Sequence, residues 1–247
     1  MKLSIITTTY NSAGTVEDTI KSVLNQIGAE IEYIIIDGGS TDGTMDIVNK
    51  YKDRIARIIS EPDGGMYDAM NKGIKLATGD IVGILNSDDI YISNEIIKTV
   101  VEKFEETGAD CLWGDLIMVD RKNPAKVIRD WKSAEYRVGS FKKGWHPPHP
   151  TFFLKKNIYD KYGLFRTDLG TSADYELMLR FLEKEKITSV YISQVLVQMR
   201  EGGEGNKSYF NLIKANFGCY KAFKINGLKV SPFFIIKKPL LKFRQYF

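Results

Sequence analysis

The chain has 247 residues, of which 43% are hydrophobic and 27% charged, a composition typical of a globular protein and not of a disordered or collagen-like one. Its two cysteines, Cys111 and Cys219, form no CxxC motif, which argues against a disulfide framework or a cysteine zinc site and suits a reducing compartment. No signal peptide is recognisable, and no apolar stretch approaches the roughly 20 residues of a membrane span. We therefore expect a cytoplasmic protein.

The net charge of +4 conceals an uneven distribution. Residues 207–247 contain nine Lys or Arg and no Asp or Glu. The whole chain has 35 basic and 31 acidic residues, so residues 1–206 hold 26 basic and 31 acidic residues and carry a net charge of −5. The sequence thus predicts a mildly acidic body with a basic tail.

Apolar strands and helices alternate through the first part of the chain. Strands this continuously apolar are typical of parallel sheets buried on both faces, so the alternation predicts a doubly wound α/β fold. Neither GxGxxG nor GxxxxGK[ST] is present, which disfavours a dinucleotide site and a P-loop. The predicted strands cover 3–9, 32–37, 55–60 and 81–85, and the predicted helices 15–26, 44–51, 67–77 and 94–106.

The pattern is looser beyond residue 110. We expect a strand over 111–119, a hairpin turn at 121–124 and a Pro-rich loop over 145–150. A helix over 174–183 and a strand over 189–199 follow.

Acidic residues follow three consecutive predicted strands: Asp37, Asp63 and the pair Asp88-Asp89. In an open parallel sheet these positions share the edge where ligands bind. Any one of them can be explained as a helix N-cap. Several acids at one edge repel one another unless a cation or hydroxyl lies between them, and a divalent metal and a ribose meet that need.

Four segments carry a resemblance to a known family: SIITTTYN (4–11), IDGGSTDGT (36–44), EPDGGMYDAMNKG (61–73) and LNSDD (85–89). They resemble family 2 inverting glycosyltransferases, and the third segment is similar to the bacterial polysaccharide branch. The resemblance implies a GT-A, Rossmann-like fold, a mostly parallel sheet flanked by helices. It covers residues 1–205, with a nucleotide-sugar half (1–107) and an acceptor half (108–205), and leaves 206–247 as a helical, basic and aromatic tail.

The resemblance implies a donor site for a nucleotide sugar. Asp37 would hold the uracil or ribose, and Asp88, the last acid of the family's DxD motif, would ligate Mn²⁺ or Mg²⁺. Asn86 occupies the first position of that motif, where Asp is commoner. The residues implied on the donor side are Thr9, Tyr10, Asp37, Asp63, Asn86, Asp88 and Asp89.

The segment TSADYELMLR (171–180) resembles the family's second acidic motif, in which Asp174 would be the general base. Such a base is needed because a sugar hydroxyl is a poor nucleophile until its proton is removed. Many relatives have Glu where this chain has Ala173. The alternative for Asp174 is an acid at a helix N-terminus, stabilised by the helix dipole.

Three further residues are candidates. His149, in the Pro-rich loop, would lie beside the diphosphate or the acceptor, or else pack locally. Trp145 would stack on an acceptor sugar or simply pack. Arg200 precedes a glycine-rich segment that would close over the donor pyrophosphate or serve as a plain linker.

The tail contains nine basic residues and ten aromatic ones, and 211–224 is predicted to form an amphipathic helix. No nucleic-acid motif accompanies this composition. A peripheral contact with anionic lipid fits better, and a helix docked on the body is the alternative.

We conclude from the sequence that a metal-dependent enzyme moves a hexosyl or N-acetylhexosaminyl unit from a UDP-sugar to a saccharide or lipid-linked saccharide. The setting would be surface polysaccharide synthesis at the cytoplasmic face of the inner membrane. An inactive, membrane-associated sugar- or nucleotide-binding module is the alternative. A nucleotidyltransferase is disfavoured, because residues 7–12 lack the glycine-rich basic loop it would need after the first strand.

Overall fold

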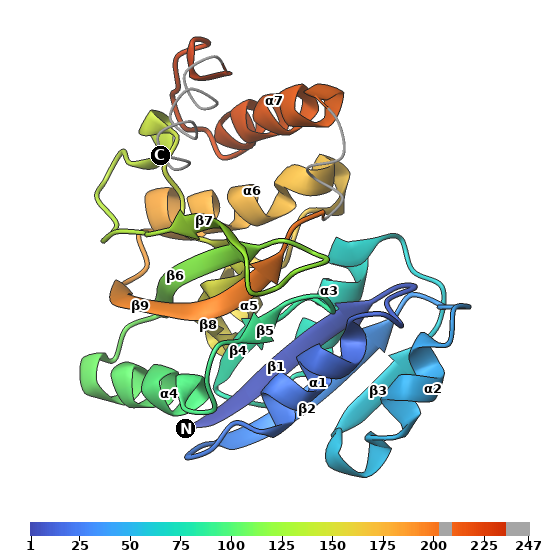
Figure 1. Ribbon diagram of the computed structural model, residues 1–247. Helices are drawn as coiled ribbons and strands as arrows, with labels where there is room; N and C mark the ends of the chain where they lie inside the picture. The colour runs from blue at the N-terminus through green and yellow to red at the C-terminus, as the bar shows by residue number, and fades with distance from the viewer. Residues whose placement is uncertain (203–208, 236–247) are drawn as a thin grey trace.

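The computed structural model describes residues 1–202 and 209–235, which form a mixed sheet flanked by helices (Figure 1). Most of the glycine-rich segment after Arg200 and the last twelve residues, 236–247, lie outside the described residues. Within that described part, no helix has the length and apolarity needed to cross a membrane.

The first part of the chain forms the predicted alternation, and its four main strands are parallel, in the order β3-β2-β1-β4. The prediction was wrong for β3 in one respect: it is an edge strand and is only partly buried. The elements are β1 (Lys2–Thr9), α1 (Val16–Leu24), β2 (Glu30–Asp37), α2 (Thr44–Asn49), β3 (Arg57–Ser60), α3 (Met66–Leu76) and β4 (Ile81–Ile84).

The second part continues the same sheet with mixed directions. Strand β8 is antiparallel to β4 and β6, whereas β9 is parallel to β6 and antiparallel to β5. The predicted hairpin is confirmed, because β7 pairs antiparallel with β6. The elements are β5 (Ile90–Tyr91), α4 (Ile96–Thr107), β6 (Cys111–Val119), β7 (Val127–Trp131), β8 (Phe153–Lys155), α5 (Lys156–Tyr162), α6 (Ala173–Leu179) and β9 (Ser189–Arg200).

Side chains of the central strands alternate between two cores, as the two-residue period of a strand requires. In β1, Ile5 belongs to the cluster that includes α1 and α4, whereas Ile6 belongs to the cluster that includes α3 and α6. Both side chains are fully buried. The two layers of helices thus hold the sheet rigid and leave the ends of its strands free to carry a site.

The helix expected over 174–183 is confirmed in its extent, although its second half is not α-helical. It ends as an α-helix at Leu179 and continues as a wider π-type turn over Arg180–Lys184. Arg180 pairs with the buried Glu176 (Nε to Oε1, 3.1 Å) and also donates to the carbonyl oxygens of Gly163 and Leu164. These bonds tie the helix to the segment that follows α5.

The described part of the tail forms α7 (Tyr209–Ile225), which packs against α6 at the end of the molecule farthest from β3 and α2 (Figure 1). Phe223 is fully buried against Tyr175 and Phe234. The outer face of α7 exposes Lys214, Phe217, Lys221 and Lys224. For these residues, docking on the body is what the structure shows; the division of the chain into three units stays a prediction.

Candidate active site

Asp37 ends β2 and organises the loop that follows it. The register of the sheet pairs it with Thr9 of β1 on one side and with Ser60 of β3 on the other. Its buried carboxylate accepts hydrogen bonds from the backbone N–H groups of Gly39 (3.1 Å) and Ser40 (3.0 Å) and from the hydroxyls of Ser40 and Ser60. Asp37 therefore fixes the shape of this edge of the sheet.

Tyr10 and Asp63 both approach Gly38, the residue after Asp37. A Cβ atom at Gly38 would lie 2.7 Å from Asp63 Oδ2 and 3.4 Å from Tyr10 Cδ2, so a larger residue here would displace the Asp63 carboxylate. The Tyr10 ring is 65% exposed. Thr9 Oγ1 is buried and has no hydrogen-bond partner within the described residues. The structure thus brings together four of the residues predicted on the donor side, Thr9, Tyr10, Asp37 and Asp63.

Short loops join this group to the end of β4. Ser12 Oγ lies 2.8 Å from Ser87 Oγ, and Asn11 N donates to Ser40 Oγ (2.8 Å). Sequence reasoning did not assign these small polar residues to the site. Asp37, at the end of β2, and Asp88, in the turn after β4, consequently lie at one edge, on the two sides of β1.

Half-buried Asn86 and fully buried Asp89 form a pair after β4. Asn86 Nδ2 donates to Asp89 Oδ2 at 3.0 Å, and the Oδ1 atom of each residue is buried without a partner in the described chain. Burial, and next the charge of Asp88, raise the pKa of the Asp89 carboxyl well above its ordinary value, although bonds from Asn86 and the Arg200 backbone oppose the change. The amide of Asn86 thus supports Asp89.

Asp88 extends from the same turn, with a quarter of its side chain exposed, and Arg121 Nη1 lies 3.2 Å from its Oδ2. Arg200, at the end of β9, pairs with Asp18 (Nη2 to Oδ2, 2.5 Å). Arg200 is 9% exposed, and its Nη1 has no partner among the residues described. Sequence reasoning missed Asp18 and Arg121, because each meets its partner only through the fold.

The described residues contain no cluster of three or more His, Cys, Asp or Glu side chains arranged to hold a metal ion. A cation that needs only one protein carboxylate, with further ligands from a substrate, is still compatible with these residues. Mg²⁺-like ions usually bind through one or two carboxylates and the phosphates of a substrate. The partly exposed carboxylate of Asp88 fits a cation that a diphosphate brings with it.

Asp174 lies in the first turn of α6, and Tyr175 N donates to its Oδ1 (2.7 Å). Two rings lie near it. Burial, and next the charge of Asp174, raise the pKa of Tyr67 well above its ordinary value. Burial lowers the pKa of His149, and the charge of Asp174 opposes that change. Phe165 contacts both rings, with centroids 5.4 Å from Tyr67 and 5.6 Å from His149.

The edge that carries Thr9, Tyr10, Asp37 and Asp63, named the donor edge after its predicted ligand, is linked to Asp174 through the start of α3. Asp63 Oδ1 accepts a hydrogen bond from Gly65 N (2.7 Å), and Tyr67 follows two residues later. The same short segment therefore contacts Gly38 at one end and Asp174 at the other. Ala173, the residue before Asp174, is fully buried.

Trp145 packs within an aromatic cluster. Its ring centroid lies 5.9 Å from that of Trp113, 5.8 Å from that of Phe141 and 6.2 Å from that of Tyr136. The indole is half-buried. Its contact with an acceptor stays a prediction.

Comparison with known proteins identifies the family of this chain. Residues 4–163 match the family described as Glycosyl transferase family 2. The chain belongs to this family. It is 33% identical over 186 residues to an uncharacterized glycosyltransferase of Mycobacterium tuberculosis, covering 72% of this chain and 68% of that protein. It is 27% identical over 212 residues to a PGL/p-HBAD biosynthesis glycosyltransferase of the same organism, covering 81% and 77%.

Two solved structures confirm the expected GT-A fold. S. aureus TarS 1–349 in complex with UDP superposes with a TM-score of 0.64 at 21% identity, covering 88% of this chain and 65% of that one. The mannosyltransferase PcManGT of Pyrobaculum calidifontis, in complex with GDP-Man and Mn²⁺, gives 0.66 at 20% identity, covering 99% and 69%. The present chain, a member of glycosyltransferase family 2, thus spans about two thirds of the length of each of these two solved structures.

Proposed function

We propose that this protein transfers one sugar from a nucleotide diphosphate donor, UDP-linked, to a carbohydrate acceptor with inversion at the anomeric carbon. The observation that carries the proposal is the gathering of Thr9, Tyr10, Asp37 and Asp63 at the edge of a parallel sheet to which Asp88 also belongs. Structural neighbours support it, since TarS is described with UDP and PcManGT with GDP-Man.

The donor edge offers suitable contacts for a nucleoside. The exposed ring of Tyr10 provides an apolar face on which a base can stack. The orphan hydroxyl of Thr9 and the carboxylate of Asp63 supply polar partners beside it. Bound at Asp88, Mn²⁺ or Mg²⁺ would neutralise charge on the diphosphate as it leaves.

Asp174 is the proposed general base. It takes the proton of the acceptor hydroxyl while that oxygen forms a bond to the anomeric carbon, and the bond from that carbon to the phosphate oxygen breaks on the opposite face. Tyr67 and His149, close to Asp174, would hold the carboxylate and border the acceptor. Arg200, next to Asp89, adds positive charge near the leaving group.

The acceptor we propose is a saccharide or lipid-linked saccharide of surface polysaccharide synthesis, at the cytoplasmic face of the inner membrane. The exposed lysines of α7 and the exposed rings of Phe217 and Phe233 support a peripheral contact, because basic and aromatic side chains together bind anionic membrane surfaces. Sedimentation with vesicles containing phosphatidylglycerol should carry the protein down at low salt. The double variant Phe217→Ser, Phe233→Ser should stay in the supernatant, and no sedimentation of the wild type would contradict the contact.

The function is tested with a panel of nucleotide sugars, with and without Mn²⁺, followed by thermal unfolding. Because stabilisation grows with ligand concentration relative to Kd, the preferred donor raises Tm most. Release of nucleoside diphosphate on addition of saccharide acceptors then tests transfer. No stabilisation by any donor would contradict the proposal. Detected transfer would exclude an inactive binding module, which the presence of Asn86 and Ala173 at motif positions otherwise leaves open.

A further inference from the structure

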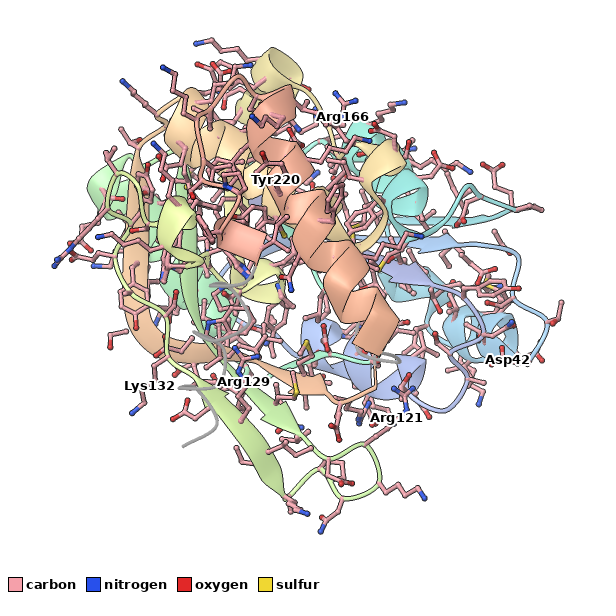
Figure 2. The ribbon with its side chains drawn as sticks, turned by 90° about the horizontal axis from the view of Figure 1, so that it is seen from above. Asp42, Arg121, Arg129, Lys132, Arg166 and Tyr220 are labelled. Carbon is pink, nitrogen blue, oxygen red and sulfur yellow. The ribbon has the colours of Figure 1, made fainter. Side chains whose placement is uncertain are left out.

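Arg121 lies at the tip of the β6–β7 hairpin, outside every motif of the family resemblance. Its Nη1 is 3.2 Å from Asp88 Oδ2, although the two residues are 33 positions apart in the sequence. Half of the Arg121 side chain is exposed. Figure 2 shows Arg121 on the side of the hairpin that faces the N-terminal elements. Arg129, in β7, and Lys132, just after β7, lie farther from those elements.

The sheet fixes this meeting. Strand β9 lies between β5 and β6: Gln198 pairs with Ile90, the residue after Asp89, and Arg200 pairs with Val119. Glu201 N also donates to the carbonyl of Val119 (2.9 Å). Since neighbouring strands are about 4.8 Å apart, a long side chain from the β6 side can cross the end of β9 to Asp88.

The backbone at Arg121 is held in place while its side chain is free to turn. Asp120 Oδ1 accepts hydrogen bonds from Lys122 N (2.8 Å) and Asn123 N (2.9 Å), which fixes the turn. Within the described residues the guanidinium pairs with Asp88, and half of the side chain is exposed. Gly202 lies alongside, where a Cβ atom would be 3.8 Å from Arg121 Cδ.

A diphosphate at this edge would change the partner that Arg121 prefers. A divalent cation and a guanidinium compete for the same oxygen of Asp88 and repel each other. Arginine binds phosphate through two parallel hydrogen bonds, which are stronger than bonds between neutral groups. Arg200, with its unpaired Nη1 among the described residues, adds positive charge on the same strand end.

We propose that Arg121 is a ligand of the donor's diphosphate: it pairs with Asp88 in the free protein and turns to the phosphate oxygens when a divalent cation binds Asp88. This inference rests on the proposed function. In this arrangement the cation and the nucleotide bind cooperatively, because the cation frees Arg121 from Asp88 and the phosphate keeps Arg121 away from Asp88.

The test compares the wild type with Arg121→Gln and with the matched control Lys122→Gln, the next residue of the same exposed turn. Calorimetry measures binding of UDP and of GDP in Mn²⁺, and electron paramagnetic resonance measures binding of Mn²⁺ alone. For whichever of UDP and GDP binds the wild type more tightly, Arg121→Gln should lower the affinity about tenfold or more, because a hydrogen bond to a charged group is lost. It should bind Mn²⁺ alone severalfold more tightly, because Asp88 is released. Lys122→Gln should leave both affinities within about twofold.

Three results would overturn the inference: unchanged nucleotide affinity in Arg121→Gln, an equal loss in Lys122→Gln, or a loss of nucleotide affinity without a gain in Mn²⁺ affinity. A wild-type protein that binds neither UDP nor GDP would overturn the proposed function as well. Wild-type binding with an unaltered Arg121→Gln variant overturns this inference alone.

Discussion

The donor edge and the acceptor side of the site are built in different ways. At the donor edge, small polar residues within short loops satisfy one another, as when Asp37 accepts from Gly39 and Ser40. On the acceptor side, rings from distant segments surround Asp174, and Tyr67 is 107 positions away from it along the chain. The first region is thus built from hydrogen bonds between short polar loops, and the second from packing between segments that are far apart in the sequence.

Asp174→Asn should have the largest effect, and it should change turnover without changing donor binding. Loss of the proposed general base should lower turnover by about 10² to 10⁴, the usual contribution of such a group. The affinity for UDP should stay within about twofold, because Asp174 lies outside the donor edge. Turnover assays and calorimetry measure the two effects.

Asp168→Asn is the matched control for that change. Asp168 is an exposed acid shortly before α6 and pairs with Arg166, so its loss should leave both turnover and UDP affinity unaltered. If Asp174→Asn abolished UDP binding, Asp174 would have a structural role, and the donor edge and the acceptor side would not be independent.

Phe223→Ala tests whether α7 is an integral part of the acceptor side. Truncating this fully buried ring should lower the free energy of unfolding by about 3 to 5 kcal/mol, because a cavity replaces its contacts with Tyr175 and Phe234. Phe217→Ala, on the exposed face of the same helix, should cost less than about 0.5 kcal/mol. Urea unfolding measures both variants, and equal stabilities would show that α7 is not docked in solution.

Glu32→Gln probes the polar construction of the donor half. Burial alone would raise the pKa of Glu32, but hydrogen bonds from Ser4 and Thr78 outweigh it and lower the pKa to about 2. Because the pKa falls below its ordinary value of 4.5, this stabilisation is complete above pH 4.5 and is lost as the pH falls toward 2.

The variant should therefore lose about 2 to 3 kcal/mol of unfolding free energy at pH 7, and the loss should shrink at pH 3. Urea unfolding at the two pH values measures it. Glu30→Gln, at the exposed start of the same strand, is the control and should stay near the wild type at both. A loss for Glu32→Gln that does not depend on pH would contradict this account.

Much of the fold could be predicted because its signals are local. The apolar runs correctly predicted that the first four main strands are parallel, and the predicted strand over 111–119 matches β6. The short strands β5 and β8 and the mixed directions beyond β4 could not be predicted, since they depend on pairing between distant segments. The π-type turn after Leu179 escaped for the same reason, because Arg180 binds carbonyls from the end of α5 and the loop beyond it.

The candidate site shows the same division. Asp37 and Asp88 were placed at one edge by the rule that parallel strands end together. The contact of Tyr67 with Asp174, the pair of Arg200 with Asp18 and that of Arg121 with Asp88 carry no pattern in the sequence, because each joins residues that only the fold brings together.

Calorimetry of UDP binding to the wild type and to Asp88→Asn, each in EDTA and in Mn²⁺, tests the central claim most directly. The claim is that Asp88 holds a cation shared with the diphosphate. Mn²⁺ should raise the affinity of the wild type for UDP at least about tenfold, since the cation adds a strong electrostatic contact. Asp88→Asn should bind UDP with the same affinity in EDTA and in Mn²⁺, because the cation has lost its ligand. An equal gain in both proteins, or none in the wild type, would contradict the account.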